Sequence, residues 1–80
     1  MSRENLEKYD KIFVERFGVK PEQLAGLAYK SVPAWDSVGH MELLVEIGEE
    51  FGLELEMEDM VDFSSYEAGK RILAKHGVEF

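Results

Sequence analysis

Apolar side chains recur at helical spacing in three segments of the chain. From about Glu4 to Phe17 they fall on one side of a helix whose opposite side is charged. The apolar side consists of Leu6, Tyr9, Ile12, Phe13 and Phe17. Gly18 follows as a suitable C-terminal stop. This segment predicts an amphipathic first helix packed on a core.

The second segment, Ser37 to Phe51, is apolar around most of its circumference. Asp36 directly before it is a good N-cap, and Gly52 directly after it is a good stop. Its apolar positions are Val38, Met41, Leu43, Leu44, Val45, Ile47 and Phe51. An arc of roughly 100° is acidic instead, and it holds Glu42, Glu46, Glu49 and Glu50. We expect a central helix with one exposed acidic strip.

The third periodic segment begins near Ser64 or Ser65, where Ser64 and Glu67 have the spacing of a capping box. Its apolar stripe is Tyr66, Gly69, Ile72 and Leu73. Before it, residues 53–57 alternate in polarity, but no second strand candidate exists to pair with them. We therefore expect an extended connector there, with Leu53 and Leu55 packed inward, followed by a short helical turn over residues 58–61.

Residues 19–36 have no clean period and predict a long ordered loop, with a short turn of helix near residues 22–24. Trp35 is its most conspicuous apolar anchor. Loops of this length in compact domains tend to be functional or disordered, and the apolar anchors favour the first. The prediction is one domain over residues 1–80 with an all-α fold. It is a four-helix bundle of three main helices and one short one, with the long loop between helices one and two.

The distribution of charge along the chain indicates more about possible partners than the total charge does. The chain has 80 residues and a net charge of −8, which argues against a nucleic-acid partner. Between Lys30 and Lys70 there is no Lys or Arg, whereas 11 of the 17 acids lie there. A solvated surface is one interpretation, and docking to a basic partner is the other.

Several kinds of chemistry are not expected. No apolar run approaches the roughly 20 residues of a membrane span, and no secretion signal begins the chain, so we expect a cytoplasmic protein without membrane insertion. There is no cysteine, and the acidic cluster over residues 54–62 lacks the ligand spacing of an EF-hand, so no metal site is predicted.

Ser37 is the residue that carries candidate chemistry. It stands at the first position of a predicted helix, where free backbone amides and the helix dipole favour a phosphate. His40 lies one turn later, but no acid is placed to orient its imidazole for a catalytic pair. We expect no catalytic residues, and we expect His40 on the surface.

Asp36-Ser37-Val38, with the acidic and apolar helix that ends in Glu49-Glu50-Phe51-Gly52, resembles the acyl carrier protein family. That family attaches 4′-phosphopantetheine to the serine of an Asp-Ser-Leu motif at the start of its second helix, and Val38 stands where leucine is usual. The resemblance covers nearly the whole chain. Residues 35–40 look most like stand-alone carriers outside bulk fatty acid synthesis, and the Gly-Gly common in peptidyl carriers is missing.

The resemblance implies a monomeric, non-enzymatic carrier of acyl or aminoacyl thioesters on an arm at Ser37, with Asp36 presenting the serine. Its partners would be a holo-synthase (a phosphopantetheinyl transferase), a loading ligase and acyl-processing enzymes with basic docking patches. These would belong to fatty acid, specialised metabolite or polysaccharide biosynthesis. The implied docking residues are Val38, Met41, Glu42, Val45, Glu46, Glu49, Glu56, Glu58 and Asp59.

Two questions stay open at this point. Leu44, Ile47 and Met57 are candidates to line a cleft for an acyl chain, but the sequence does not identify the cargo. The alternative function is an unmodified acidic protein-interaction module of the same fold.

Overall fold

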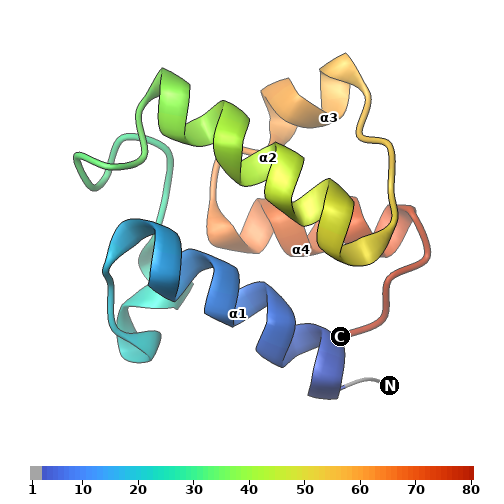
Figure 1. Cartoon of the computed structure of the whole chain (residues 1–80), viewed down its shortest axis with the longest axis horizontal. Helices are drawn as coiled ribbons and strands as arrows, with labels where there is room; N and C mark the ends of the chain where they lie inside the picture. Colours follow the sequence, from blue (N-terminus) through green and yellow to red (C-terminus); the bar gives the residue numbers. More distant parts are fainter. Residues whose placement is uncertain (1–2) are drawn as a thin grey trace.

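A computed structural model describes residues 3–80, and within them the chain is helical. The elements are α1 (Arg3–Phe17), the 3₁₀ helix η1 (Pro21–Gly26), α2 (Ser37–Phe51), α3 (Met57–Asp62) and α4 (Tyr66–Lys75) (Figure 1). The described residues form no β-strand, which confirms the all-α prediction. None of these helices has the length and apolar character needed to cross a bilayer.

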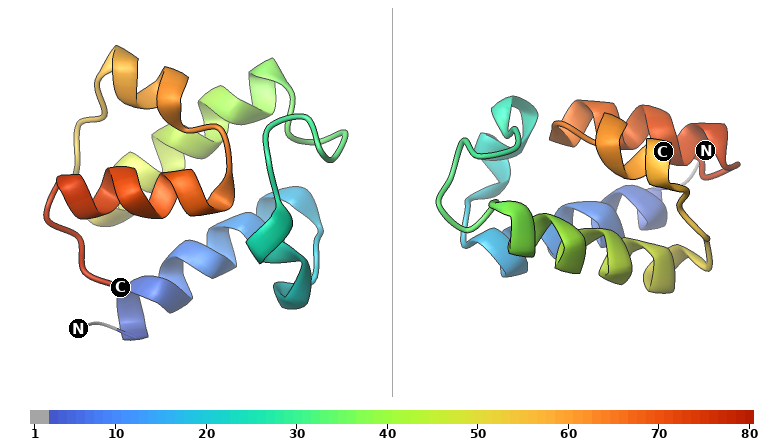
Figure 2. Two further views of the ribbon diagram at one scale, coloured as in Figure 1. Left: turned by 180° about the vertical axis from the view of Figure 1, so that it is seen from behind. Right: turned by 90° about the horizontal axis from the view of Figure 1, so that it is seen from above.

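The helices pack as a flattened bundle in which α1 contacts α2, and α3 contacts α4 (Figures 1 and 2). The loop from α1 to α2 wraps one end of the bundle, and η1 within it contacts both α1 and α4. The C-terminal segment returns to the start of α1, where the side-chain amide of Asn5 donates to the carbonyl of Glu79 at 3.0 Å.

The core is built around aromatic rings, with Phe13 of α1 at its centre. Its ring lies 5.6 Å from that of Trp35 in the long loop and 5.4 Å from that of Tyr66 in α4, both edge to face. Phe63, between α3 and α4, stacks on it at 6.4 Å. Edge-to-face pairs stabilise a fold beyond the burial of their apolar area. The Phe13 side chain of α1 therefore links this helix to both the long loop and α4.

The bounds of α2 are those predicted from its capping residues. The carboxylate of Asp36 accepts a hydrogen bond from the backbone N–H of Gly39 at 2.8 Å, which satisfies one of the unpaired amides of the first turn. At the other end Gly52 has φ of +65°, the left-handed conformation that ends many helices. Both predictions are confirmed.

The start of α4 differs from the predicted capping box. Ser65 is the N-cap, and its hydroxyl accepts from the N–H of Ala68 at 3.0 Å. Ser64 instead belongs to a short pairing with the long loop, because its carbonyl accepts from the N–H of Tyr29 at 2.9 Å. An antiparallel bridge between Ala28 and Ser65 continues this pairing. The loop is thus fastened to the start of α4 through the backbone.

The short helix α3 is fastened to the end of α4 by Asp59. Its side chain is only 3% exposed, and it accepts from Lys75 Nζ at 2.9 Å and pairs with His76 Nε2 at 2.8 Å. This corrects the prediction of Asp59 as a docking residue. Its carboxylate faces the end of α4, where it bonds to the side chains of Lys75 and His76, and it is not presented to a partner.

We expect Asp59→Asn to lower the free energy of unfolding at neutral pH. We also expect the free energy of unfolding of this variant to depend less on pH between pH 4 and 2. The hydrogen bonds from Lys75 and His76 lower the pKa of Asp59 to about 2 in the folded state, against ~3.9 in an unfolded chain. The stabilisation is therefore fully present above about pH 4 and is lost as the pH falls towards 2. Urea denaturation of both proteins across this range would measure it.

Asp62→Asn is the matched control, because Asp62 is an exposed acid of the same helix and its side chain does not share the hydrogen bonds that Lys75 and His76 give to Asp59. The expected result for this control is a pH dependence close to that of the unaltered protein. Equal slopes for Asp59→Asn and the unaltered protein between pH 4 and 2 would contradict the role given to Asp59.

Candidate functional site

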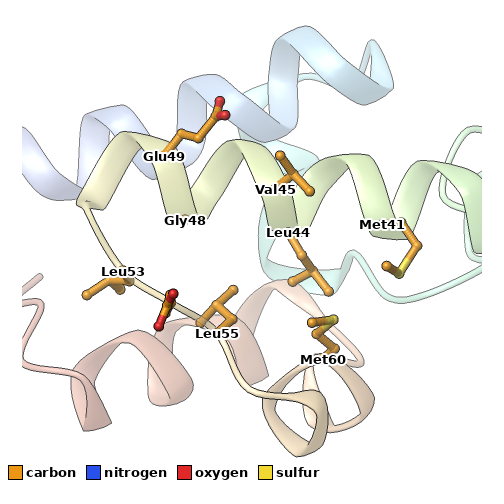
Figure 3. Close-up of a pocket in the computed structure, with 9 residues that line it drawn as sticks. Met41, Leu44, Val45, Gly48, Glu49, Leu53, Leu55 and Met60 are labelled. Carbon is orange, nitrogen blue, oxygen red and sulfur yellow. The ribbon is translucent and has the colours of Figure 1, made fainter.

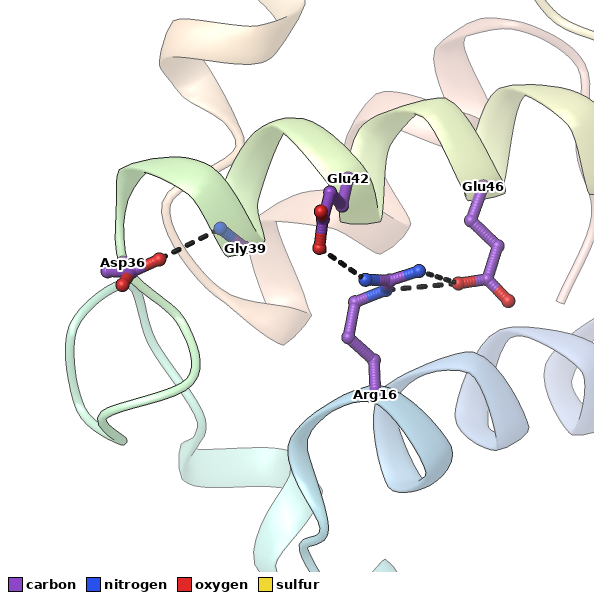
Figure 4. Close-up of polar contacts among 5 residues, drawn as sticks. All are labelled: Arg16, Asp36, Gly39, Glu42 and Glu46. Carbon is purple, nitrogen blue, oxygen red and sulfur yellow. Dashed lines mark hydrogen bonds and ion pairs between the residues drawn. The ribbon is translucent and has the colours of Figure 1, made fainter.

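Ser37 is exposed at the first position of α2. Its hydroxyl makes one polar contact among the described residues, a 3.1 Å hydrogen bond with the hydroxyl of Tyr29 in the long loop. Asp36 beside it is also exposed, but its carboxylate is held at the helix end by the bond to Gly39 (Figure 4). The site therefore presents one hydroxyl at a helix start, which follows a capping carboxylate in the sequence and contacts a phenol from the long loop.

The loop before Ser37 is drawn tightly against the first turn of α2. A Cβ placed on Gly39 would lie 2.1 Å from the backbone oxygen of Ala34, which no side chain can tolerate without a movement of the backbone. The turn is closed by a 2.9 Å bond from the N–H of Lys30 to the carbonyl of Trp35. Lys30 adopts a left-handed φ of +67°, a strained conformation for a non-glycine residue.

We expect Gly39→Ala to lower the free energy of unfolding by about 1–3 kcal/mol, because the forced contact outweighs the better helix propensity of alanine. Chemical denaturation measures this change. Gly26→Ala is the control, since no atom lies within 4 Å of its added Cβ. Its stability should be unchanged or raised by up to about 1 kcal/mol. Equal stability of the two variants would contradict the close approach of the loop.

His40 is not the surface residue that the sequence predicts. It is half-buried, and Trp35 Nε1 donates to its Nδ1 at 3.0 Å. The indole is only a donor, so Nδ1 is the acceptor and Nε2 carries the proton, which it donates to the carbonyl of Met60 at 2.9 Å. His40 thus ties the loop and α2 to α3. The predicted role of Trp35 as the loop anchor is confirmed, since its side chain is completely buried.

The predicted apolar docking residues lie on the outer side of α2. Val38, Met41 and Val45 are 67%, 52% and 58% exposed, and they follow one another along the helix after Ser37. Two further exposed apolar residues, Met57 and Val61, lie on α3. The acidic residues Glu49, Glu56 and Glu58 are exposed as well. Exposed apolar side chains in such a row are typical of a surface that contacts another molecule.

Glu42 and Glu46 are exposed or half-exposed, but they are already paired within the chain. Arg16, in the last turn of α1, donates from Nη1 to Glu42 Oε1 at 3.0 Å and from Nη2 to Glu46 Oε1 at 2.7 Å (Figure 4). Its Nε donates to the same oxygen of Glu46 at 3.0 Å. The acidic strip thus has an internal cation from a different part of the chain, which sequence reasoning did not place.

A double-mutant cycle between Arg16 and Glu46 should give a coupling free energy of about 0.5–1 kcal/mol in chemical denaturation, the upper part of the range for partly exposed pairs. The comparison pair is Lys11 and Glu15, whose side chains are 72% and 63% exposed and 3.9 Å apart. Its coupling should be about 0.3 kcal/mol or less. Equal couplings would show that the Arg16 geometry adds nothing.

The residues predicted to line a single acyl cleft are divided between hollows beside α2. Leu44 lines a cavity of about 280 Å³ between α2 and the connector, together with Val45, Leu53, Leu55 and Met60 (Figure 3). Met57 lines a second hollow of about 400 Å³, which also contains Tyr29 and His40. Ile47 is fully buried in the core and lines neither. The structure therefore does not bring these three residues together around one hollow, although Met41 and Met60 line both hollows.

The second hollow lies next to Ser37, because Tyr29 belongs to its lining and also contacts the Ser37 hydroxyl. Tyr29 and Arg16 are the two residues of the site that the sequence did not indicate. Neither stands in the motif around Ser37, and no periodic pattern joins them to it. Residues 3–80 contain no group of three or more His, Asp or Glu side chains arranged to hold a metal ion.

The sequence matches no protein-family model, and no curated protein matches it significantly.

Proposed function

We propose that this chain is a carrier protein that holds a 4′-phosphopantetheine arm on Ser37 and presents acyl or aminoacyl groups to partner enzymes. The observation that carries the proposal is the exposed Ser37 hydroxyl at the first position of α2. The helix start favours a negatively charged phosphate there. The resemblance of residues 36–38 to the serine motif of acyl carrier proteins agrees with this position.

The residues present fit such an arm. In the attachment, the Ser37 oxygen forms a bond to phosphorus while the diphosphate bond of coenzyme A breaks, and adenosine 3′,5′-bisphosphate leaves. The hydroxyl proton passes to a base of the transferase. When bound, the arm supplies a terminal thiol that carries the cargo as a thioester, and the chain itself has no cysteine. Ser37 is exposed enough for a transferase to reach it.

The surroundings of His40 argue against a hydrolase that uses Ser37 as a nucleophile. Such an enzyme needs an imidazole nitrogen that accepts the serine proton. Trp35 occupies Nδ1, and Nε2 donates to the carbonyl of Met60. Neither nitrogen is directed to Ser37. The protein's part is presentation and recognition, and the chemistry belongs to the arm and to the partner enzymes.

Recognition by partners would use the outer side of α2 and the adjoining α3. The exposed Val38, Met41 and Val45 would supply apolar contact, and Glu49, Glu56 and Glu58 would face a basic patch. Complementary charge speeds encounter and orients the two proteins. A basic partner that also engages Glu42 and Glu46 would compete with Arg16 for them.

Incubation of the purified protein with a broad-specificity phosphopantetheinyl transferase and coenzyme A should add the mass of one phosphopantetheine. Intact-protein mass spectrometry measures the gain. Ser37→Ala should abolish it, because the acceptor oxygen is removed. Ser64→Ala is the control, since Ser64 is another exposed serine directly before a helix cap. It should gain the full mass.

A protein that gains no mass, or that gains it despite Ser37→Ala, would overturn the carrier function. The unmodified interaction module would then be the better account of the same surface. That alternative requires Ser37→Ala to keep full activity in the host, and charge reversal at Glu49 and Glu58 to abolish it.

A further inference from the structure

We infer that Tyr29 is the residue that holds the phosphate of the arm at Ser37. This inference rests on the proposed function. The hydroxyls of Tyr29 and Ser37 are 3.1 Å apart, and this is the one hydrogen bond of the Tyr29 hydroxyl within residues 3–80. Within these residues, the phenol therefore has no other hydrogen-bond partner that would compete with a phosphate attached to Ser37.

The position of Tyr29 is set by contacts that do not involve Ser37. Its backbone N–H donates to the carbonyl of Ser64 at 2.9 Å, next to the bridge between Ala28 and Ser65. Its ring meets the ring of His40 edge to face at 5.2 Å. His40 is itself fixed by its bonds to Trp35 and Met60. Backbone pairing and ring packing thus aim the phenol at the start of α2 before any group is attached.

Modification of Ser37 determines the direction of the hydrogen bond. In the free protein either hydroxyl can donate, but an esterified Ser37 oxygen has no proton left. Tyr29 must then be the donor, and the charged oxygens of the phosphodiester are stronger acceptors than the ester oxygen. Hydrogen bonds to ionised acceptors are roughly twice as strong as those between neutral groups. Tyr29 therefore gains a better partner than the one it has.

The charges around Ser37 favour stabilisation of a phosphate by an uncharged hydrogen-bond donor such as a phenol. Asp36 adds a carboxylate directly before Ser37, so a phosphate there faces a like charge. Lys30 supplies the nearest compensation along the chain, and its ammonium lies 5.5 Å from the centre of the Tyr29 ring. The phenol and this lysine together make the loop side of Ser37 the favourable side for the phosphate.

Phosphorus NMR of the modified protein tests this directly. In the modified Tyr29→Phe protein, the phosphodiester resonance should shift from that of the unaltered modified protein, and its line should narrow because the phosphate is less restrained. Ser64→Ala is the matched control, because it removes an exposed hydroxyl near Tyr29 but keeps the backbone carbonyl that accepts from the Tyr29 N–H. Its phosphorus resonance should stay in place.

A second measurement needs no variant at the site. In protein labelled at Cζ of its tyrosines, modification of Ser37 should move the carbon resonance of Tyr29. The other two tyrosines, Tyr9 and Tyr66, are buried and serve as internal references that should not move.

The outcomes separate this inference from the function on which it rests. Absence of any mass gain would overturn the proposed carrier function, and the role of Tyr29 with it. A full mass gain with an unmoved Tyr29 carbon resonance, or with the same phosphorus resonance in Tyr29→Phe as in the unaltered protein, would overturn the role of Tyr29 alone. A phosphorus shift in Ser64→Ala as large as that in Tyr29→Phe would also overturn the role of Tyr29.

Discussion

The indole of Trp35 enters the core two residues before Ser37, and the geometry of the site depends on this insertion. Its ring stacks on Phe17 at 5.1 Å and meets Phe13 edge to face, which joins the end of the long loop to α1. Its N–H needs an acceptor in this buried position, and His40 provides one. His40 also donates to the carbonyl of Met60 in α3. The buried indole N–H of Trp35 thus helps to fix the positions of the long loop, α2 and α3 relative to one another.

This arrangement explains why an exposed serine can sit in a defined place. Ser37 has few contacts of its own, yet the residues before and after it are fixed by burial of Trp35 and by the close approach of Ala34 to Gly39. Loops that carry functional residues are typically held in this way by a rigid scaffold. Ser37 is therefore exposed without being loosely placed.

The parts that could be predicted from the sequence are those that depend on neighbouring residues. The bounds of α2 follow from Asp36 and Gly52, and the buried stripes of α1 and α4 follow from spacing alone. The pairing of Arg16 with Glu46 and the contact of Tyr29 with Ser37 join residues that local patterns treat separately. The partners of Asp59 are likewise hidden from local patterns, because Lys75 and His76 stand at the end of α4 and share no motif with it.

The uneven distribution of charge gives the molecule a permanent electric dipole. Residues 1–30 carry six Lys or Arg and five acids, and residues 70–80 carry three and one, whereas residues 31–69 carry eleven acids alone. The helices α2 and α3 belong to this negative segment, and both lie above α1 in the view of Figure 1. A dipole experiences a torque in the field of another charged body before any contact forms. A positively charged surface would thus favour an approach by the side of the protein that carries α2 and α3.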